Sequence, residues 1–585
     1  MPLSFTSATE YHWEVRKIAV IGPGIVGMPM AALLAAAGIR EGSDAPARVV
    51  VVQRASPTSA WKVDAINAGR SVIGGVEPAL DAIVARAVGN GLLSATHDYH
   101  DIADADLILV SVQTDKRGFG PDYGPLFESL DGLAAALRER PAGNVPVIVF
   151  ESTLAPSSMT TVVREHFARH GLVEGRDLLL GNSPNRVMPG RLVERVAASD
   201  KLVAGLHPLT PVLIDRVYRR IVTGGRLHRT NSLTAEFVKT LENAYRDVRI
   251  AFAAELVRYC DAHDIDFYQV RDAVNARLGE SDAASGSATA VPSGAILIPA
   301  VGVGGHCLPK DGILLWWRRH ESGAATDASL ILQSRIINDE SPDATIRLAE
   351  RSFGPLAGRR IALMGTAYRF DSEDTRNSPT LALARRLIAL GADPKLHDPY
   401  VKPDDQNLLR AGLADRFTQS SAVALADAEI AIFCVGHSVY ADGLAGLVAQ
   451  APELAGIVDG ANLFRRDALG LLAAVPGRAA IRYCGIGRGS RPAPAGFVDF
   501  VVDAFRVAER GVANELVELI DFLNARYAPD AFNRIEFDTV RRLAGSCVTG
   551  CSIAAAGAID ALPSFDGFTP RLVRTAPRGA ALATA

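Results

Sequence analysis

The sequence predicts an α/β protein with two doubly wound domains, joined by a long central helix and followed by a mostly helical C-terminal extension. Three observations predict this architecture. A buried strand at 16–21 leads into a glycine-rich turn and an apolar helix, residues 233–256 form a helical pattern without glycine or proline, and a second strand–turn–helix unit starts at 358. At 585 residues the chain is also too long for a single core.

The glycine-rich turn follows the pattern G-x-G-x-x-G, with Gly22, Gly24 and Gly27 at its three glycine positions. Glycines in this arrangement let the backbone approach a pyrophosphate at the N-terminus of the following helix. The turn comes after one strand and before a second at 47–53, which makes the unit Rossmann-like. We therefore predict that this turn, including Ile25 and Val26, binds a dinucleotide.

The end of the second strand bears on which dinucleotide is bound. An acidic residue usually binds the ribose hydroxyls of NAD there, but this chain has Gln53 and Arg54. Since an arginine can favour the 2′-phosphate of NADP, NAD is expected and NADP remains open. Small polar residues end the next strands, where a parallel sheet binds its ligand; they are Ser111, Thr114, Ser152 and Thr153.

The central helix carries four polar residues on one face, Glu236, Lys239, Asn243 and Asp247. Two interpretations are open: a solvated face, or a polar stripe that lines a cleft. The alanine-rich character of the helix also predicts a self-packing surface, and hence a homodimer through the central helix.

One cysteine, Cys307, lies in a glycine-rich loop with His306 before it and Lys310 and Asp311 after it. A thiol near a cation or another polarising group becomes a good nucleophile, because the thiolate is the reactive form. A buried, inert cysteine is the alternative. The glycines and charges around Cys307 favour the catalytic interpretation.

Composition excludes several classes of protein. The formal net charge of −4 and the absence of a Lys/Arg run indicate no nucleic-acid partner, and no apolar segment approaches the roughly 20 residues of a membrane helix. The first residues do not form a secretory signal, and six cysteines in so long a chain fit reduced thiols, so a cytoplasmic location is expected. Cys547 and Cys551 lack a second ligand pair, and no metal is expected.

These patterns predict a domain order along the chain. The predicted parts are an N-terminal extension (1–15), an NAD(P)-binding Rossmann domain (16–230), a central helical domain with the cysteine loop (231–330), a second Rossmann-like domain (331–485) and the extension (486–585). Within the extension we expect helices at 497–527 and 537–562, and a disordered tail from 569.

In this order, the motifs resemble those of the UDP-glucose/GDP-mannose dehydrogenase family over about residues 16–485. The remaining motifs that carry the resemblance are Ser111–Thr114, Glu151–Pro156, Ser183–Gly190, Lys239-x-x-x-Asn243, Gly304–Cys307, Gly365–Arg369 and Asp374–Pro379. The Gly-Gly-His-Cys sequence looks more like the UDP-N-acetylhexosamine branch, whereas Leu308–Asp311 is closer to the UDP-glucose and GDP-mannose branches.

The resemblance implies oxidation of the C6 alcohol of a UDP-sugar to a uronic acid with two NAD, through a thiohemiacetal and a thioester on Cys307. It implies that Lys239 and Asn243 stabilise an oxyanion, that Asp311 organises the nucleophile and that Thr153 holds a catalytic water. Lys310 and Arg376 match positions near the cofactor. The positions that match substrate-binding ones are Asn185, Arg186, Lys239, Asn243, Gly302, Gly304, Gly305, Tyr368 and Arg369.

The chain departs from the family pattern at three places. Asn185 replaces a glutamate that is the expected general base for thioester hydrolysis, Gln53–Arg54 replaces the acidic residue, and the extension beyond 485 matches nothing. Two alternatives are a two-electron β-hydroxyacid-type dehydrogenase, which shares the Lys-x-x-x-Asn helix, and a catalytically impaired dinucleotide-binding regulatory protein. The first would have no use for Cys307 or for a second α/β domain.

Overall fold

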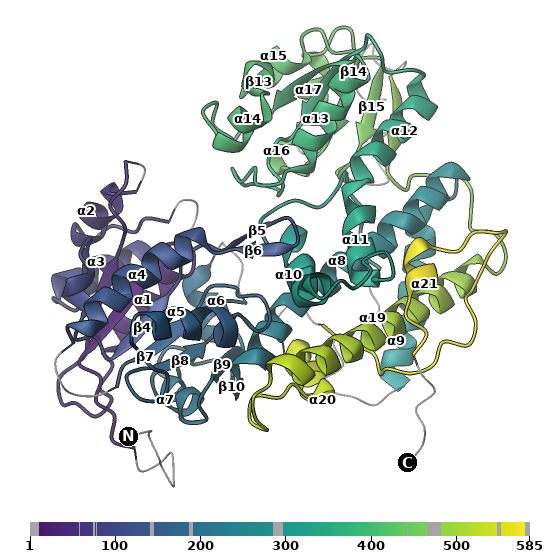
Figure 1. Ribbon diagram of the computed structural model, residues 1–585. Coiled ribbons are helices and arrows are strands. Elements are labelled where there is room, and N and C mark those ends of the chain that lie inside the picture. Colours follow the sequence, from purple (N-terminus) through teal and green to yellow (C-terminus); the bar gives the residue numbers. More distant parts are fainter. Residues whose placement is uncertain are drawn as a thin grey trace. The chain divides into compact units, whose positions relative to one another are not determined.

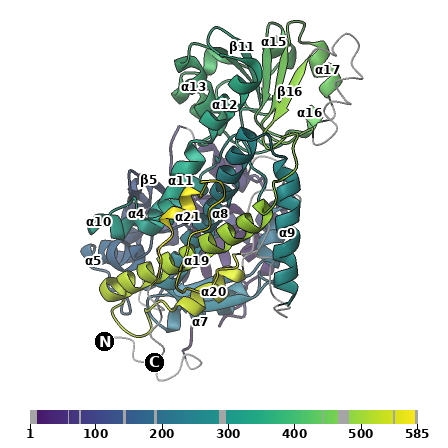
Figure 2. The ribbon, with the colours of Figure 1, turned by 90° about the vertical axis from the view of Figure 1, so that its right-hand side faces the viewer.

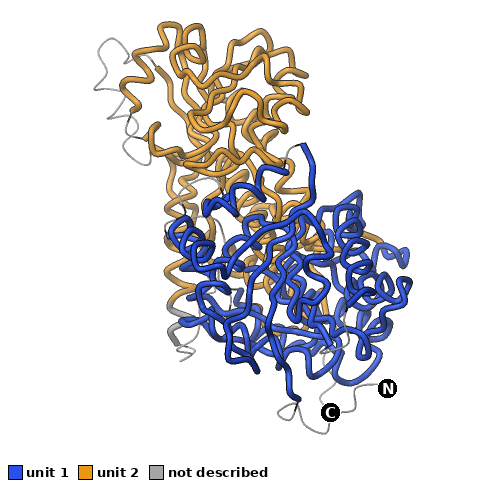
Figure 3. Tube along the Cα trace, turned by 90° about the vertical axis from the view of Figure 1, so that its left-hand side faces the viewer, with its two compact units in different colours: residues 1–242, 313–324, 516–552 blue, residues 243–312, 325–515, 553–585 orange. Residues whose placement is uncertain are grey.

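The structure is a computed structural model that describes residues 11–57, 59–73, 77, 79–140, 145–186, 191–284, 296–441, 443–464, 481–546 and 551–579. The chain divides into two compact units (Figure 3). Unit 1 contains residues 1–242, 313–324 and 516–552, and unit 2 contains residues 243–312, 325–515 and 553–585. The division falls inside three helices, α8 (Ser232–Ala262), α10 (Leu308–Glu321) and α19 (Phe497–Tyr527).

The main sheet of unit 1 has the strand order β10-β9-β8-β7-β4-β1-β2-β3 in the described residues (Figure 1). From β3 to β8 the strands are parallel and follow the doubly wound order, whereas β9 pairs antiparallel with β8. The bounds are β1 (Lys17–Ile21), β2 (Arg48–Val52), β3 (Leu93–Thr96), β4 (Leu107–Val110), β7 (Val147–Phe150), β8 (Leu179–Asn182), β9 (Lys201–Gly205) and β10 (Leu227–Asn231). A separate hairpin joins β5 (Asp115–Arg117) to β6 (Gly120–Asp122).

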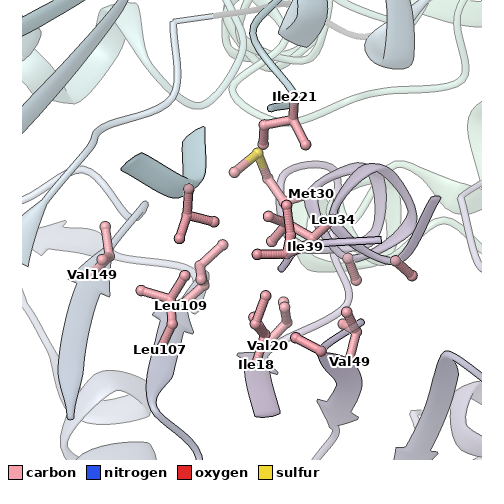
Figure 4. Packing of buried hydrophobic residues seen from close by; sticks show 14 of the residues in the cluster. Ile18, Val20, Met30, Leu34, Ile39, Val49, Leu107, Leu109, Val149 and Ile221 are labelled. Carbon is pink, nitrogen blue, oxygen red and sulfur yellow. The ribbon is translucent and has the colours of Figure 1, made fainter. Parts of the chain in front are cut away.

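Helices cover both faces of this sheet, so its central strands are apolar throughout. Ile18 and Val20 of β1 contribute to the core cluster on the side of α1, α3 and α7, and Ala19 and Ile21 to the cluster on the side of α4 and α5. Figure 4 shows the first of these cores, with side chains from β1 and β4 pointing toward Met30 of α1. The bounds are α1 (Gly27–Ala37), α2 (Trp61–Asn67), α3 (Leu80–Gly89), α4 (Gly124–Arg138), α5 (Arg164–Arg169), α6 (Leu192–Ala198) and α7 (Leu209–Tyr218).

Unit 2 contains the second sheet, with all strands parallel in the order β13-β12-β11-β14-β15-β16 (Figure 2). The strand bounds are β11 (Arg360–Met364), β12 (Asp393–His397), β13 (Phe417–Thr418), β14 (Ile430–Phe433), β15 (Gly456–Asp459) and β16 (Arg482–Gly485). Its helices are α9 (Phe267–Ala284), α11 (Leu330–Asp339), α12 (Ser341–Phe353), α13 (Pro379–Ala389), α14 (Gln406–Ala411), α15 (Ser421–Leu425), α16 (Ser438–Ala441) and α17 (Leu444–Ala449).

Each sheet has a glycine directly after its first strand, at the point where the strand order reverses. Gly22 follows β1 with φ +89°, and a Cβ there would lie 2.9 Å from the carbonyl oxygen of Ser111, after β4. Gly365 follows β11 with φ +98°, and its Cβ would lie 2.6 Å from Val435. Only glycine tolerates both this φ and this approach, so the two turns are alike in construction.

The predicted fold class and its main elements are confirmed, and two expectations are wrong. Of the two interpretations left open for the polar face of α8, the solvated face is excluded, because Glu236 and Asp247 are buried. The helix expected at 537–562 ends at Gly545 (α20, Phe537–Gly545). The tail expected to be disordered from 569 instead contains helix α21 (Arg571–Thr575).

The C-terminal extension packs on α8 in unit 2 and on the end of β10 in unit 1. In unit 2, Tyr245 of α8 donates a hydrogen bond of 2.5 Å to Glu509 of α19. The Glu255 carboxylate of α8 accepts the backbone N–H groups of Arg571 and Leu572 at 2.8 and 3.0 Å, and so caps the N-terminus of α21. In unit 1, the side chain of Asn231 donates to the carbonyl groups of Phe532 and Arg534.

We predict a pH-dependent weakness at Glu174, just before β8. Its Oε2 accepts a hydrogen bond of 2.7 Å from the backbone N–H of Leu180, whereas its Oε1 is buried without a partner. Burial raises the pKa of Glu174 to about 8. Because the folded state then holds a proton that the unfolded state releases, unit 1 loses stability as the pH rises from about 4.5 to about 8.

Glu174→Gln keeps an acceptor for Leu180 and removes the titrating group. At about pH 8 we expect its thermal unfolding midpoint to exceed that of the wild type by roughly 2–8 °C, equivalent to about 1–2 kcal/mol in a unit of this size. At about pH 5 the two midpoints should be nearly equal, and Glu165→Gln, which alters an exposed carboxylate on α5, should change neither. A gain of the same size at both pH values would contradict the assignment.

Candidate active site

The turn after β1 in unit 1 is built to receive an anion. Met28 donates its backbone N–H to the carbonyl of Gly24, and α1 starts with no side-chain cap and no acidic residue in its first turn. A Cβ on Gly24 would meet nothing within 4 Å, whereas one on Gly27 would lie 2.1 Å from the carbonyl oxygen of Gly22. The helix N-terminus and the open approach at Gly24 therefore fit a dinucleotide pyrophosphate.

Gln53 and Arg54, which follow β2, both have partners within the protein. The Gln53 amide donates to the carbonyl of Arg54 and to the hydroxyl of Ser59, each at 3.1 Å. The Arg54 guanidinium forms an exposed ion pair with Glu128 of α4. This carboxylate partly neutralises the cation that the sequence offered for a 2′-phosphate, and it would repel that phosphate.

The loops after β4 and β7 are tied to each other. Thr114 donates its hydroxyl to the carbonyl of Thr153 at 2.7 Å, and Ser152 donates to the carbonyl of Val112 at 2.5 Å. The hydroxyl of Ser111 is buried without a partner, beside Gly27. The predicted cofactor residues of these loops therefore lie together at the carboxyl edge of the first sheet.

A buried ion pair fixes the start of the loop after β7. Lys201 of β9 lies 2.7 Å from the carboxylate of Glu151, which is fully buried at the end of β7. Tyr218 donates to the same carboxylate at 2.6 Å, and burial beside Glu151 raises the pKa of Tyr218, so the phenol remains a donor. Glu151 therefore has a structural role. The sequence analysis named it only as part of the Glu151–Pro156 motif and assigned it no role.

Arg186 and Asn185 follow β8. The Arg186 guanidinium pairs with Glu242 of α8, both side chains being almost completely buried, and donates to the carbonyl of Leu543 at 2.9 Å and to the hydroxyl of Ser546 at 3.1 Å. The backbone N–H of Asn185 donates to the carbonyl of Glu151 at 3.3 Å. The sequence analysis missed Glu242, 56 positions away, and the end of α20, more than 300 positions away, because nothing in the local sequence around Arg186 marks such distant partners.

The polar face of α8 is buried and its acidic residues have partners. Glu236 accepts the backbone N–H groups of Ser157 at 2.9 Å and of Met159 at 2.7 Å, and burial raises the pKa of Glu236 to about 8. Asp247 lies 2.9 Å from the guanidinium of Arg335. Lys239 is 8% exposed on the same helix.

The cysteine loop belongs to unit 2. The carbonyl of Cys307 accepts the backbone N–H groups of Lys310 and Asp311, so Cys307 lies at the N-terminus of α10, and its side chain is exposed. Asn243 donates its amide to the Asp311 carboxylate at 2.5 Å, and the Lys310 ammonium lies 3.8 Å from the same, fully buried carboxylate. The structure thus brings together Cys307, Asp311 and Asn243, as predicted for the nucleophile and its neighbours.

The glycines of this loop pack against the segment after β11. A Cβ on Gly304 would lie 2.5 Å from the Cβ of Tyr368, and one on Gly305 would lie 2.9 Å from the tyrosine ring. Gly305 also donates its backbone N–H to the carbonyl of Arg376 at 2.8 Å. Gly302 is closed in the same way by Pro379. These glycines therefore allow the cysteine loop to pack closely against Tyr368 and Pro379.

Two predicted binding residues, Tyr368 and Arg376, contact the glycines that precede Cys307. Burial raises the pKa of Tyr368, with smaller contributions from nearby charges that include Cys307. The Arg376 guanidinium pairs with Asp374 at 2.5 Å, and this hydrogen bond raises the pKa of Arg376. Arg369 stacks over Phe370, which is exposed.

The fold and these residues are typical of one class of protein, a dehydrogenase with a dinucleotide-binding turn in one α/β unit; the other unit carries an exposed cysteine in a glycine-rich loop. The family follows from sequence comparison. The chain matches the NAD binding domain of the UDP-glucose/GDP-mannose dehydrogenase family over residues 16–222, the central domain over 233–340 and the UDP binding domain over 362–466. The chain belongs to this family and is an NAD-dependent nucleotide-sugar dehydrogenase.

Individual relatives agree with the family. The UDP-N-acetyl-D-mannosamine dehydrogenase of Pyrococcus horikoshii is 30% identical over 397 residues, covering 67% of this chain and 85% of that protein. The NDP-N-acetyl-D-galactosaminuronic acid dehydrogenase of Ralstonia solanacearum is 29% identical, covering 73% and 92%. A crystal structure of the enzyme of the same name from Methanosarcina mazei is similar with a TM-score of 0.65 and 28% identity, covering 81% and 96%.

Two smaller expectations concern a membrane and a zinc site. None of the helices in the described ranges combines the length and the apolar character needed to cross a bilayer. Cys547 lies outside the described residues, and Cys551 is buried with its thiol 3.7 Å from the carbonyl of Glu242.

The Arg54–Glu128 pair predicts how the cofactor is selected. We expect Glu128→Gln to raise kcat/KM with NADP by about two- to fivefold, since an exposed ion pair contributes up to ~1 kcal/mol. The value with NAD should change little, because NAD has no 2′-phosphate for Arg54 to bind. The measurement is steady-state turnover of a UDP-sugar with each cofactor, with Glu139→Gln, at the other end of α4, as the matched control. Equal NADP activities in the two variants would contradict the role of Arg54.

Proposed function

We propose that the protein oxidises the C6 alcohol of a UDP-sugar to the uronic acid in two steps, with Cys307 as the nucleophile. The observation that most supports this proposal is the exposed Cys307 at the N-terminus of α10, next to the buried Asp311–Asn243 hydrogen bond. A helix N-terminus stabilises negative charge, and a positioned amide and carboxylate fix the geometry around the thiol. Membership of the family supports the nucleotide-sugar substrate and disfavours the β-hydroxyacid alternative.

In the first oxidation, Lys239 and Asn243 stabilise the charge that develops on the C6 oxygen as its proton leaves. They lie one helical turn apart on α8, so a cation and an amide donor serve the same oxyanion. NAD supplies the hydride acceptor for each oxidation. Asp311 holds the amide of Asn243 through its hydrogen bond, so the donor is oriented before substrate binds.

In the second oxidation, the Cys307 thiolate adds to the C6 aldehyde and forms a thiohemiacetal, whose oxidation gives a thioester. Water then cleaves the thioester and releases the acid and the thiol. Thr153 is proposed to hold this water, and its carbonyl is itself fixed by Thr114. Asn185 cannot accept a proton as a general base at neutral pH, so we propose that hydrolysis is the slow step.

The other predicted residues keep their proposed roles. Cofactor binding is proposed for the turn at Gly22–Gly27, for Gln53 and Arg54, for the loops at Ser111–Thr114 and Ser152, and for Lys310 and Arg376. Substrate binding is proposed for the glycine loop, Tyr368, Arg369 and Arg186. The ion pair with Glu242 holds the Arg186 side chain in place. In domain terms, residues 16–230 would bind NAD and residues 331–485 the UDP moiety.

The sugar is proposed to be a UDP-N-acetylhexosamine, with UDP-glucose as the second candidate. The Gly-Gly-His-Cys sequence at Cys307 and the names of the relatives support the first. The test is turnover of UDP-GlcNAc, UDP-ManNAc and UDP-glucose with NAD, with products resolved as aldehyde or acid. A protein that binds NAD and turns over none of the three would instead be the regulatory alternative.

A homodimer through α8 is proposed from its helical surface. Glu509 and Phe505 of α19 already contact Tyr245 and Phe252 of α8, so a second copy would have to use the remaining faces of this helix. Sedimentation of the purified chain measures the state directly, and a monomer at all concentrations would reject the proposal.

Substitution of the nucleophile should separate the two oxidations. We expect Cys307→Ala to reduce acid formation by at least ~10³-fold, while the first oxidation continues and yields an aldehyde that a hydrazine reagent traps. Cys484→Ala, which removes a thiol from β16, is the matched control and should leave both products unchanged. Unaffected acid formation in Cys307→Ala would reject the thioester route.

Replacement of Asn185 tests the missing base. Since general bases contribute about 10²–10⁴-fold, we expect Asn185→Glu to speed release of the acid by at least ~10-fold. Asn185→Gln lengthens the side chain but retains the amide, so it should not speed release of the acid. It is the control for side-chain length. Rapid-quench mass spectrometry should show the thioester on Cys307 in the wild type and less of it in Asn185→Glu. If the two variants release acid at the same rate, hydrolysis does not depend on this position.

A further inference from the structure

Two histidines and one aspartate meet on the surface of unit 1, outside every residue proposed for catalysis. Asp131 lies on α4, His166 on α5, and His170 directly after α5. One ligand atom from each lies within 4.8 Å of the others, and within the described ranges no other group of three or more His, Cys, Asp and Glu is arranged in this way.

The distances are those of neighbouring ligands around one ion. Oδ1 of Asp131 lies 2.9 Å from Nε2 of His166 and 3.1 Å from Nε2 of His170. Ligands that each stand about 2.1 Å from a metal are separated by roughly 3–3.5 Å in tetrahedral or octahedral geometry. The two distances to the carboxylate match these values, and the ligand atoms of the two imidazoles lie within 4.8 Å of each other.

His166 has a feature that a simple hydrogen-bonded cluster does not explain. Its side chain is 8% exposed, and Nε2 is buried without a hydrogen-bond partner although the Asp131 carboxylate is close. The two atoms are near each other but not aligned with each other. Ligands of one metal have this relation, because each points at the ion between them.

The orientation of the His166 ring is fixed by the protein. The ring stacks on Phe127 of α4, with centroids 5.2 Å apart and an interplanar angle of 18°. The stacking holds the imidazole on the side of α4 that carries Asp131.

We propose that Asp131, His166 and His170 bind one borderline divalent cation of the Zn²⁺, Co²⁺ or Ni²⁺ class. Two imidazoles and one carboxylate favour these ions over Mg²⁺ and Ca²⁺, which prefer oxygen ligands alone. Asp131 is 58% exposed and His170 32%, so water completes the coordination. The ion would link α4 to α5, which both cover the same face of the NAD-binding sheet.

The linkage predicts a measurable effect on stability. An ion that binds the folded state but not the unfolded one raises the unfolding midpoint as its concentration exceeds the dissociation constant. Since the cluster contains no residue assigned to cofactor or substrate, this effect does not depend on the proposed function. It should appear equally in the protein with and without NAD.

The experiment uses the full-length protein after removal of metals with a chelator. Co²⁺ and Zn²⁺ are titrated against a chromophoric competitor, and thermal unfolding is followed with and without Zn²⁺. We expect one equivalent to bind, a Co²⁺ spectrum without a thiolate charge-transfer band, and a raised midpoint. The absence of that band distinguishes this site from the exposed Cys307.

His170→Gln and Asp131→Asn alter the two exposed ligands and leave the buried His166 in place. Each should weaken Zn²⁺ binding by at least ~10-fold and abolish the thermal shift. His100→Gln is the matched control, because His100 forms an exposed pair with Glu139 at 3.1 Å without a third ligand. Its affinity should equal that of the wild type. No binding by the wild type, equal binding by all variants, or a thiolate band would each overturn the proposal.

Discussion

The constraint on which the structure depends is the close approach of two loops at the centre of each sheet. In both units the chain turns after the first strand through a glycine with positive φ, and this glycine touches the loop that follows the fourth strand: Gly22 against Ser111, and Gly365 against Val435. A side chain at either glycine would separate the loops. The strand order reverses at this point in each sheet, which is where doubly wound sheets usually bind their ligands.

The polar face of α8 shows how buried charge is made tolerable in such a protein. Glu236 accepts two backbone N–H groups, Asn243 donates to Asp311, and Asp247 has Arg335. Buried polar groups without partners would cost more than these hydrogen bonds contribute, so each of these three residues fixes one neighbouring segment. The helix therefore organises the segments that carry Thr153 and Cys307, each within its own unit.

Elements with a local signal were predictable from the sequence, and those held by distant partners were not. The strands and the turn at Gly22 follow from short-range periodicity and glycine spacing. The polar face of α8 was compatible with solvent or with burial, because periodicity does not reveal what covers a helix. The tail was expected to be disordered, yet α21 forms because Glu255, more than 300 positions earlier, caps it. The α20 partners of Arg186, Leu543 and Ser546, were not predictable for the same reason.

The anchoring of the C-terminal extension has a consequence for shortened forms of the protein. The similar protein of Methanosarcina mazei matches 81% of this chain, so part of this chain has no counterpart there. Arg186 and Asn231 donate hydrogen bonds to the extension, and Glu255 accepts them from it. A chain cut before the extension would leave these three groups without those partners, so the segment is not a removable tail.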